Sequence, residues 1–314
     1  MLKSLKRKLR FAVDRDYQAK LAAENKKWGD HLKVEASGAW NAWLDHPLIL
    51  QHYRQRRLVD GIDWEKWVAH ALGGAAERSL ELGCGAAHRS IELFRGGNSR
   101  HIEGFDVSED RVAEGERLRQ ALNAPGSFQV ADVNTIALPH ETYDLIFSSH
   151  SFHHFLALEH VLAEVTQALT PHGLFVLEEY VGPTQFQWTN QQMELVRSLL
   201  SLAPESWRTL RWSAVKHLEG RPTPEEVVAV SPFESIRSAE IFPLFEQFFD
   251  LVVVKRLGGT IQHLLYNGIM HNFHEDDEEA IKYLRGVYTV EDTLIDEGLL
   301  PSDFMLLVGK RKSN

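Results

Sequence analysis

The sequence predicts an α/β protein with a doubly wound, mostly parallel sheet of seven strands, a helical N-terminal region and helical cap insertions. Three observations lead to this fold class. Short apolar segments alternate with helix-like segments between residues 78 and 180, a glycine-rich turn follows the first of them, and the alternation stops after residue 181. Alternation of this kind favours parallel strands with helices on both faces of the sheet.

The N-terminal region, residues 1–74, is predicted to be helical. Five cationic side chains and no acidic one lie in the first ten residues: Lys3, Lys6, Arg7, Lys8 and Arg10. A helical stripe of apolar side chains accompanies them: Leu2, Leu5, Leu9, Val13, Tyr17 and Leu21. The sequence favours a helix that packs on its own body, with contact to an anionic membrane surface or a partner as the alternative. Tryptophans 28, 40, 43, 64 and 67 suggest a packed pre-domain or a lid over a ligand.

The predicted core spans residues 75–180. Its strands are expected at 78–83, 101–106, 127–131, 143–149 and 173–180, with helices at 86–95, 108–122 and 156–169. The tripeptide Pro171-His172-Gly173 predicts a turn into the fifth strand.

The remaining chain is predicted as a helical cap insertion with a return helix (181–250) and the final strands with a helical insertion (251–314). Helices are expected at 184–202, 235–249 and roughly 260–299, and strands at 251–257 and 303–310. The insertions and the N-terminal region lack the strand–helix rhythm. We expect them to form a cap above the carboxyl ends of the strands, where open α/β sheets bind ligands.

Composition limits the function classes. The formal net charge of −10 argues against general nucleic-acid binding, which needs a broad basic surface. A single cysteine excludes an internal disulfide framework and favours a reducing cytoplasm. No apolar run approaches the ~20 residues of a membrane span, and no signal-peptide core is present. The expectation is a soluble cytoplasmic protein, with peripheral contact to the inner face of the membrane through the basic N-terminal helix as the open alternative.

The turn after the first strand, Glu81-Leu-Gly-Cys-Gly85, is the most informative segment. Gly83 and Gly85 allow a sharp turn and the close approach of a ligand. The following helix directs its free N–H groups toward that ligand. Glu81 argues against a phosphate there and for a positively charged ligand. Cys84 is interpreted as a small spacer in the turn.

Two further carboxylates end strands of the predicted sheet. Asp106 follows the glycine turn by about twenty residues, where doubly wound folds bind ribose hydroxyls. Asp132 ends the third strand, where it can reach an adenine amino group. Either residue alone would more often cap a helix, but their order and spacing together favour a nucleoside site.

These segments resemble class I S-adenosylmethionine-dependent methyltransferases, whose fold is Rossmann-like. The matching pieces are Glu81–Gly85, Gly104–Ser108, Ala131–Val133, Tyr143–Phe147, Phe152–His154 and Leu169–Gly173. The resemblance implies S-adenosylmethionine as cofactor, bound by Glu81, Gly83, Cys84, Gly85, Asp106, Val107, Asp132, Val133 and Ser148. The chain departs from the family at Ala87, where a third glycine is usual.

The segments beyond residue 180 are similar to a bacterial methyltransferase subgroup associated with surface glycans and secondary products. The segments are Glu179–Pro183, Phe186–Trp188, Ser231–Ser238 and Gly258–Thr260. This resemblance implies a small-molecule or glycan-linked acceptor. Its predicted contacts are Tyr180, Gln187, Trp188, Glu234 and Arg237, although a structural role, such as a Glu234–Arg237 salt bridge, is the default for each.

Methyl transfer to a hydroxyl needs a base that removes a proton. His153, with His154 as the second candidate, follows the fourth strand and is predicted to be that base, because histidine is mostly neutral at cytoplasmic pH. Glu178 and Glu179 point to opposite faces of the fifth strand, and Glu179 is the one assigned to the catalytic group. The acidic run from His274 to Glu279 is interpreted as a helix N-terminus, so no metal site is predicted.

The predicted function is therefore an O-methyltransferase with a histidine base. A small-amine N-methyltransferase is the nearest alternative. A nucleotide-dependent dehydrogenase is disfavoured because the turn Gly83–His88 lacks the third glycine of that fingerprint. A non-catalytic scaffold that retains the cofactor fold also stays open.

Overall fold

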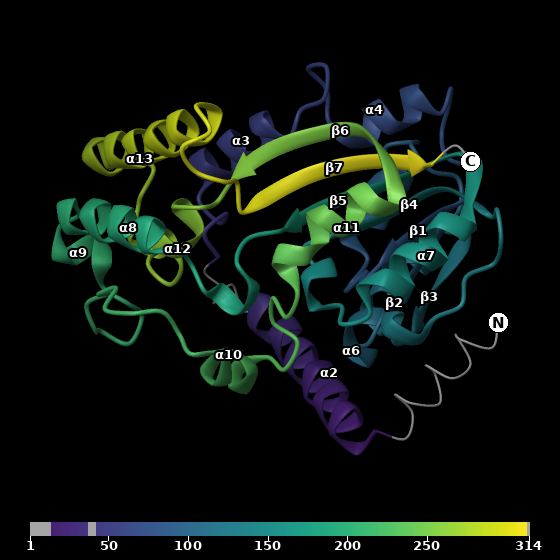
Figure 1. Ribbon diagram of the computed structural model, residues 1–314, viewed down its shortest axis with the longest axis horizontal. Helices are drawn as coiled ribbons and strands as arrows, with labels where there is room; N and C mark the ends of the chain where they lie inside the picture. The colour runs from purple at the N-terminus through teal and green to yellow at the C-terminus, as the bar shows by residue number, and fades with distance from the viewer. Residues whose placement is uncertain (1–13, 37–41, 313–314) are drawn as a thin grey trace.

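The computed structural model describes residues 14–36 and 42–312, and Figure 1 shows them arranged around one sheet. The sheet has seven strands in the order β3-β2-β1-β4-β5-β7-β6. Strands β1 to β5 pair in parallel, whereas β7 runs antiparallel to both β5 and β6. The predicted doubly wound, mostly parallel sheet is confirmed.

The strands lie close to their predicted positions. They are β1 (Ser79–Leu82), β2 (Ile102–Asp106), β3 (Gly126–Val130), β4 (Tyr143–Ser149), β5 (Leu169–Tyr180), β6 (Phe249–Gly258) and β7 (Phe304–Arg311). Strand β5 begins earlier than predicted, because Leu169 already pairs with Tyr143 and Leu174 pairs with Leu145. Pro171-His172-Gly173 therefore lies in an irregularity within β5, and the prediction of a turn that precedes the strand is wrong.

Helices cover both faces of the sheet. On one face, α7 (Leu158–Ala168) and α11 (Ser238–Phe248) pack against apolar side chains of β1, β4, β5 and β7. On the other, α3 (Pro47–Arg56) and α4 (Trp64–Ala71) pack against β4, β5 and β7. A third cluster joins α5 (His88–Arg95) and α6 (Glu109–Ala121) to β2 and β3.

The cap helices gather beyond the carboxyl end of β5, on the left of Figure 1. They are α8 (Asn190–Leu202), α9 (Glu205–Arg208), α12 (Gln262–Tyr266) and α13 (Glu278–Asp296), with α10 (Pro224–Val230) below them. The predicted helix at 260–299 is interrupted, since residues 267–277 lie between α12 and α13 and form only a short 3-10 turn, Met270–Asn272. Asp277 caps α13 by accepting bonds from Glu279 N and Ala280 N, which confirms the interpretation of the acidic run as a helix start.

One hydrophobic cluster joins all four predicted segments of the chain. Trp43, Phe147, Met193 and Phe304 come from the segments 1–74, 75–180, 181–250 and 251–314, and all are buried in this cluster. The N-terminal region, the sheet and the cap therefore share one core.

Most of the predicted basic N-terminal helix, together with Trp40, lies outside the described residues. Helix α2 (Arg15–Ala36) carries the end of its apolar stripe. Tyr17 is buried, with 4% of its surface exposed, and packs on the body of the protein. Within the described residues, no helix has the length and apolar character that a membrane span requires.

Candidate cofactor and acceptor site

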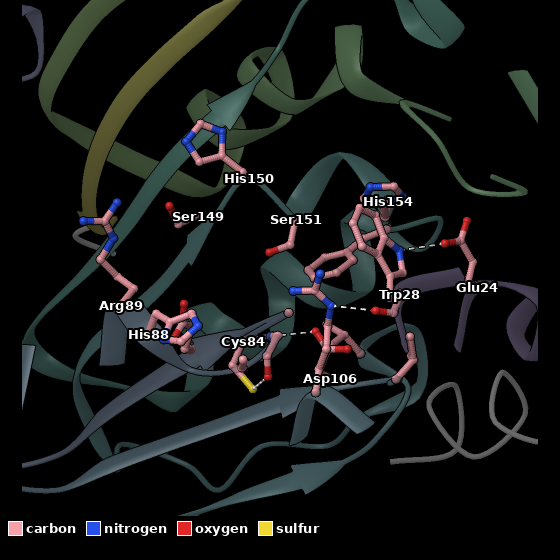
Figure 2. A pocket seen from close by; sticks show the side chains of 18 of the residues that line it. Glu24, Trp28, Cys84, His88, Arg89, Asp106, Ser149, His150, Ser151 and His154 are labelled. Carbon is pink, nitrogen blue, oxygen red and sulfur yellow. Dashed lines mark hydrogen bonds between the residues drawn. The ribbon is translucent and has the colours of Figure 1, made fainter. Parts of the chain in front are cut away.

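A cavity of about 400 Å³ lies at the carboxyl ends of the parallel strands. Its floor is the turn after β1 and the end of β2, and α2 supplies one wall (Figure 2). Nine residues predicted from the sequence line it: Glu81, Gly83, Cys84, Gly85, Asp106, Val107, Asp132, Val133 and His154. The structure thus brings together side chains from four strand ends.

The glycine turn is held by the neighbouring strand. The backbone N–H groups of Gly83 and Cys84 both donate to Phe105 O, at 2.8 and 3.0 Å. Burial raises the pKa of the Cys84 thiol well above its ordinary value, consistent with an unreactive spacer. Ala87, which replaces the family's third glycine, is buried and adopts a left-handed conformation with φ of 57°.

Asp106 and Asp132 both line the cavity, and both accept hydrogen bonds from neighbouring residues. Asp106 accepts from the backbone N–H groups of Gly85 and Ser108, both at 2.8 Å. Asp132 accepts from Asn134 N at 2.9 Å and from the hydroxyl of Tyr17 at 2.8 Å. Both carboxylates are therefore oriented before any ligand is present, which lowers the entropy cost of binding.

Glu81 is almost fully buried beneath the turn. One of its oxygens accepts from Ser90 N at 3.2 Å and from Ser90 Oγ at 2.6 Å. Burial raises the pKa of Glu81 from 4.5 to about 7, with the Ser90 hydrogen bonds acting in the opposite direction. The charge of this carboxyl group therefore changes near neutral pH.

This titration predicts a pH-dependent affinity for a cationic ligand. Glu81 is neutral well below pH 7 and carries its negative charge above it, so the affinity for S-adenosylmethionine is expected to rise between about pH 6 and 8. The part of the rise in affinity that comes from titration of S-adenosylmethionine itself should remain in Glu81→Gln. The rest of the rise should disappear in this variant. Calorimetric titrations of both proteins at several pH values measure the difference, and parallel pH profiles would contradict the prediction.

Helix α2 closes the cavity on the side of Asp106. The indole N–H of Trp28 donates to Glu24 at 2.9 Å, and Arg111 Nε donates to Trp28 O at 2.9 Å (Figure 2). The Trp28 ring also meets the ring of His154 edge-on at 5.3 Å. Of the tryptophans assigned to a possible lid, Trp28 is the one that lines the cavity among the described residues.

His153, the predicted general base, lies between two carboxylates. Its Nδ1 lies 2.6 Å from Glu179 Oε1, and its Nε2 lies 3.5 Å from Glu234 Oε1. These two carboxylates outweigh the effect of burial and raise the pKa of His153 to about 10. Both ring nitrogens of His153 thus face carboxylates, and the residue does not line the cavity where an acceptor would bind.

Glu179 is also not placed to act on an acceptor directly. It is fully buried and accepts from Ser151 N at 2.9 Å and Phe152 N at 2.5 Å, in addition to His153. Glu178 points to the opposite face, as predicted, where its carboxylate accepts from Arg57 Nη1 and Trp64 Nε1, both at 3.0 Å. Glu179 therefore fixes the segment that follows β4.

His150 is a cavity residue that the sequence analysis did not single out. It follows β4 directly, lines the cavity beside Ser149 and Ser151, and has a left-handed backbone with φ of 53° (Figure 2). Such a conformation is costly for a residue with a side chain and is common at functional sites. The only signal in the sequence was its place in the polar segment after β4.

The predicted acceptor contacts do not line the cavity. Tyr180 donates to Pro183 O at 3.1 Å, Trp188 stacks on Phe186, and Gln187 Nε2 donates to Pro222 O at 2.8 Å. Arg237 pairs with Glu159 and Glu240 instead of Glu234. Ser148, predicted to bind cofactor, is buried against Ser151 Oγ at 2.9 Å, and its neighbour Ser149 faces the cavity.

Comparison with known proteins finds a family of domains that is similar to the segment containing this cavity. Residues 74–221, slightly under half of the 314 residues, match a family described as a methyltransferase domain. This segment contains the glycine turn and every strand end that forms the cavity floor. The sheet has a Rossmann-like order, and the match to a methyltransferase domain supports the predicted cofactor, S-adenosylmethionine.

Solved structures of methyltransferases are similar at low identity. They include geranyl diphosphate C-methyltransferase from Streptomyces coelicolor (14% identity, 79% of this chain, 78% of that chain, TM-score 0.49). An S-adenosylmethionine-dependent methyltransferase from Mesorhizobium loti is 16% identical, over 79% of this chain and 98% of that chain, with a TM-score of 0.43. Phosphoethanolamine N-methyltransferase 2 from Haemonchus contortus is 14% identical, over 86% of this chain and 59% of that chain, with a TM-score of 0.48. No curated protein matches the chain.

Proposed function

We propose that this protein transfers a methyl group from S-adenosylmethionine to a hydroxyl of a small-molecule or glycan-linked acceptor. The observation that carries the proposal is the cavity in which the Gly83–Gly85 turn, Asp106 and Asp132 meet, inside a segment that matches a methyltransferase domain. The bacterial glycan-associated subgroup is part of this proposal and is supported by the sequence resemblance beyond residue 180.

The cavity walls suggest how the cofactor would be held. Asp106 would accept hydrogen bonds from the ribose hydroxyls, as a carboxylate at the end of the second strand does in doubly wound folds. Asp132 and Val133 would face the adenine, and ionised Glu81 would favour the positive end of the molecule. The turn N–H groups and the N-terminus of α5 complete the cradle.

The chemistry needs an acceptor positioned in line with the methyl–sulfur bond, and most of the rate enhancement comes from that positioning. We assign the removal of the hydroxyl proton to His150. His150 and His154 both line the cavity, but burial and the neighbouring His153 lower the pKa of His154 to about 4, which makes it a weak base. His150 is less enclosed, with a side-chain exposure of 35%.

Asp106→Ala is expected to weaken S-adenosylmethionine binding by ~1–3 kcal/mol, because hydrogen bonds to a charged acceptor are lost. Asp110→Ala, which removes an exposed carboxylate at the start of α6, is the matched control and should bind normally. Calorimetry with S-adenosylmethionine and with a nicotinamide dinucleotide measures both affinities. Binding of the dinucleotide alone, or an unchanged affinity in Asp106→Ala, would refute the site assignment.

His150→Ala is expected to lower turnover ~10²- to 10⁴-fold while the cofactor affinity changes little, because a general base acts only on the acceptor. The assay follows transfer of a radiolabelled methyl group to a panel of sugar hydroxyls, phenols and small amines. His140→Ala, which removes an exposed histidine outside the cavity lining, serves as the control. Full activity of His150→Ala on a hydroxyl acceptor would remove it from the mechanism.

Two alternatives are distinguished by the same panel. Transfer to amines alone, with little dependence on His150, would favour the N-methyltransferase, since an amine needs less help from a base. Cofactor binding without any transfer would favour the scaffold. Membrane contact through the basic residues 1–12 is a separate proposal, and removal of those residues should abolish binding to anionic vesicles if it is correct.

A further inference from the structure

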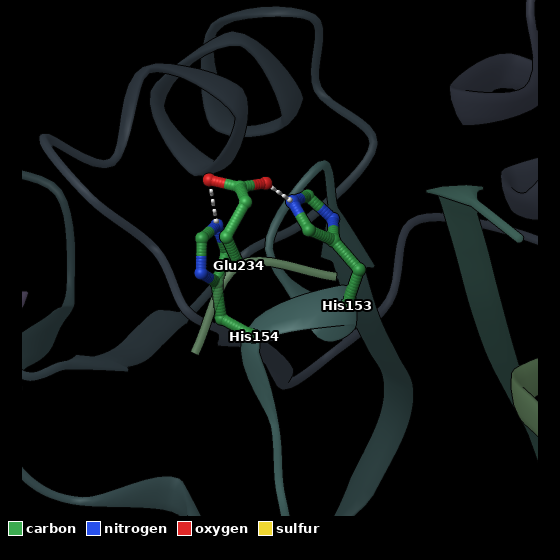
Figure 3. A group of neighbouring side chains, drawn as sticks. All are labelled: His153, His154 and Glu234. Carbon is green, nitrogen blue, oxygen red and sulfur yellow. Dashed lines mark ion pairs between the residues drawn. The ribbon is translucent and has the colours of Figure 1, made fainter. Parts of the chain in front are cut away.

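A cluster of three potential metal ligands lies beside the cavity: His153, His154 and Glu234 (Figure 3). The two histidines lie on the 3-10 turn Phe152–His154, and Glu234 lies in the loop between α10 and α11. One ligand atom from each of the three lies within 4.8 Å of the others. Their side chains are 12–16% exposed, so the cluster is largely shielded from water.

We propose that His153, His154 and Glu234 bind a divalent transition-metal ion of the Zn²⁺ type. Imidazole nitrogen and carboxylate oxygen are ligands that Zn²⁺ and Co²⁺ accept, and three protein ligands with an open fourth position are usual in reactive zinc sites. Nothing in the sequence spacing predicted this set, because Glu234 is 80 residues beyond His154.

The spacing of the cluster suits a tetrahedral ion. His153 Nε2 lies 3.5 Å from Glu234 Oε1, and His154 Nε2 lies 4.0 Å from Glu234 Oε2. A tetrahedron with bonds of about 2.0–2.1 Å has edges of roughly 3.3 Å. Small side-chain rotations would close the difference. In addition, His154 Nδ1 is buried and has no hydrogen-bond partner among the described residues, so this nitrogen does not tie the ring to another polar group.

Glu179 supplies the support that metal-binding histidines usually have. Its carboxylate contacts His153 Nδ1 at 2.6 Å and is itself fixed by the N–H groups of Ser151 and Phe152. A carboxylate on the far nitrogen orients the ring and makes the ligating nitrogen more basic. This gives buried Glu179 a role as a positioning residue.

The ion would lie at the wall of the cavity, because His154 belongs both to the cluster and to the cavity lining. The open coordination position could then take a water molecule or an oxygen of the acceptor. That last step depends on the proposed function, whereas binding of the ion does not.

Lys27 is the main competitor for the site. Its Nζ lies 3.4 Å from Glu234 Oε2, where it neutralises part of the carboxylate charge. An ion must displace this amino group. Lys27→Ala should therefore bind the metal more tightly than the natural protein, several-fold by titration. If His153, His154 and Glu234 formed only an ion-pair network with Lys27, there would be no reason for Lys27→Ala to bind the metal ion more tightly.

The experiment is a titration of the full-length protein with Co²⁺ in the absence of S-adenosylmethionine, followed by displacement with Zn²⁺. The natural protein should bind one Co²⁺ per chain with the visible absorption of a tetrahedral site. His154→Ala and Glu234→Gln should bind at least ~100-fold more weakly, and Glu179→Gln ~10- to 100-fold more weakly. The control His172→Ala, which removes an exposed histidine of β5, should bind like the natural protein.

Circular dichroism establishes that each variant is folded before titration. Should a variant not fold, the natural protein and Lys27→Ala remain sufficient to decide. Failure of the natural protein to bind Co²⁺ or Zn²⁺, or equal binding by folded His154→Ala and Glu234→Gln, would overturn the proposed metal site. Because no cofactor or acceptor is present, neither result bears on the methyltransferase proposal.

Discussion

Gly83→Ala is expected to weaken S-adenosylmethionine binding by roughly 2–3 kcal/mol, about 30- to 150-fold in Kd. Gly83 has a φ of 69°, a conformation that L side chains rarely adopt, and an added Cβ would lie 2.5 Å from Ser151 Oγ. Ser151 cannot easily move aside, since its hydroxyl bonds Leu82 O at 3.1 Å and Ser148 Oγ at 2.9 Å. The turn would have to shift out of the geometry that forms the cavity floor.

Gly97→Ala is the matched control for this experiment. Gly97 has nearly the same φ, 70°, but an added Cβ there meets no atom within 4 Å, and the residue is not part of the cavity lining. We expect it to lose about 1 kcal/mol of stability and no affinity. Calorimetry and thermal unfolding of both variants separate the backbone strain from the effect on the site. Normal affinity in Gly83→Ala would show that the turn does not contact the cofactor.

Glu291→Gln is expected to destabilise the protein by about 2–4 kcal/mol, the largest stability effect that we predict. Glu291 is fully buried on α13, and each carboxylate oxygen accepts two hydrogen bonds. The donors are Gly259 N, Ile261 N, Gln262 N and Gln262 Nε2. A glutamine has one acceptor oxygen and would turn its own N–H groups toward two of these donors.

Urea or thermal unfolding measures this loss. Glu297→Gln applies the same chemical change to an exposed position just beyond α13 and should stay within about 0.5 kcal/mol of the natural protein. Similar stability of the two variants would mean that the Gly258–Gln262 segment does not depend on this carboxylate. Such a result would also remove our explanation for why the Gly258-Gly259-Thr260 segment is held at the end of β6.

The sheet and the floor of the cavity were predictable because local signals determine them. Apolar strand segments, the turn at Gly83 and the carboxylates at 106 and 132 each act within a few residues of their place in the fold. The acceptor side was not predictable in the same way. His150 has a left-handed backbone beside the cavity, and the two ring nitrogens of His153 meet Glu179 and Glu234, which reach it from other parts of the chain.

The contacts of α2 also could not be predicted from the sequence. Tyr17 reaches Asp132 and Trp28 reaches His154 across more than one hundred residues of sequence. The apolar stripe of this helix was visible, but the surface that receives it was not. Similarly, Gln187 and Trp188 carry side chains suited to a sugar or aromatic ring, yet Gln187 donates to Pro222 O, Trp188 stacks on Phe186, and neither lines the cavity.

The hydrophobic cluster shared by the sheet and the cap has a consequence for cooperativity. Leu145, Phe147 and Val176 on the strands are covered by side chains that arrive from both ends of the chain. Without those contributions the isolated strand–helix segment would expose a large apolar face and would be prone to aggregate. We therefore expect the strand–helix segment to reach its folded state only after β7 has been synthesised and has joined the sheet.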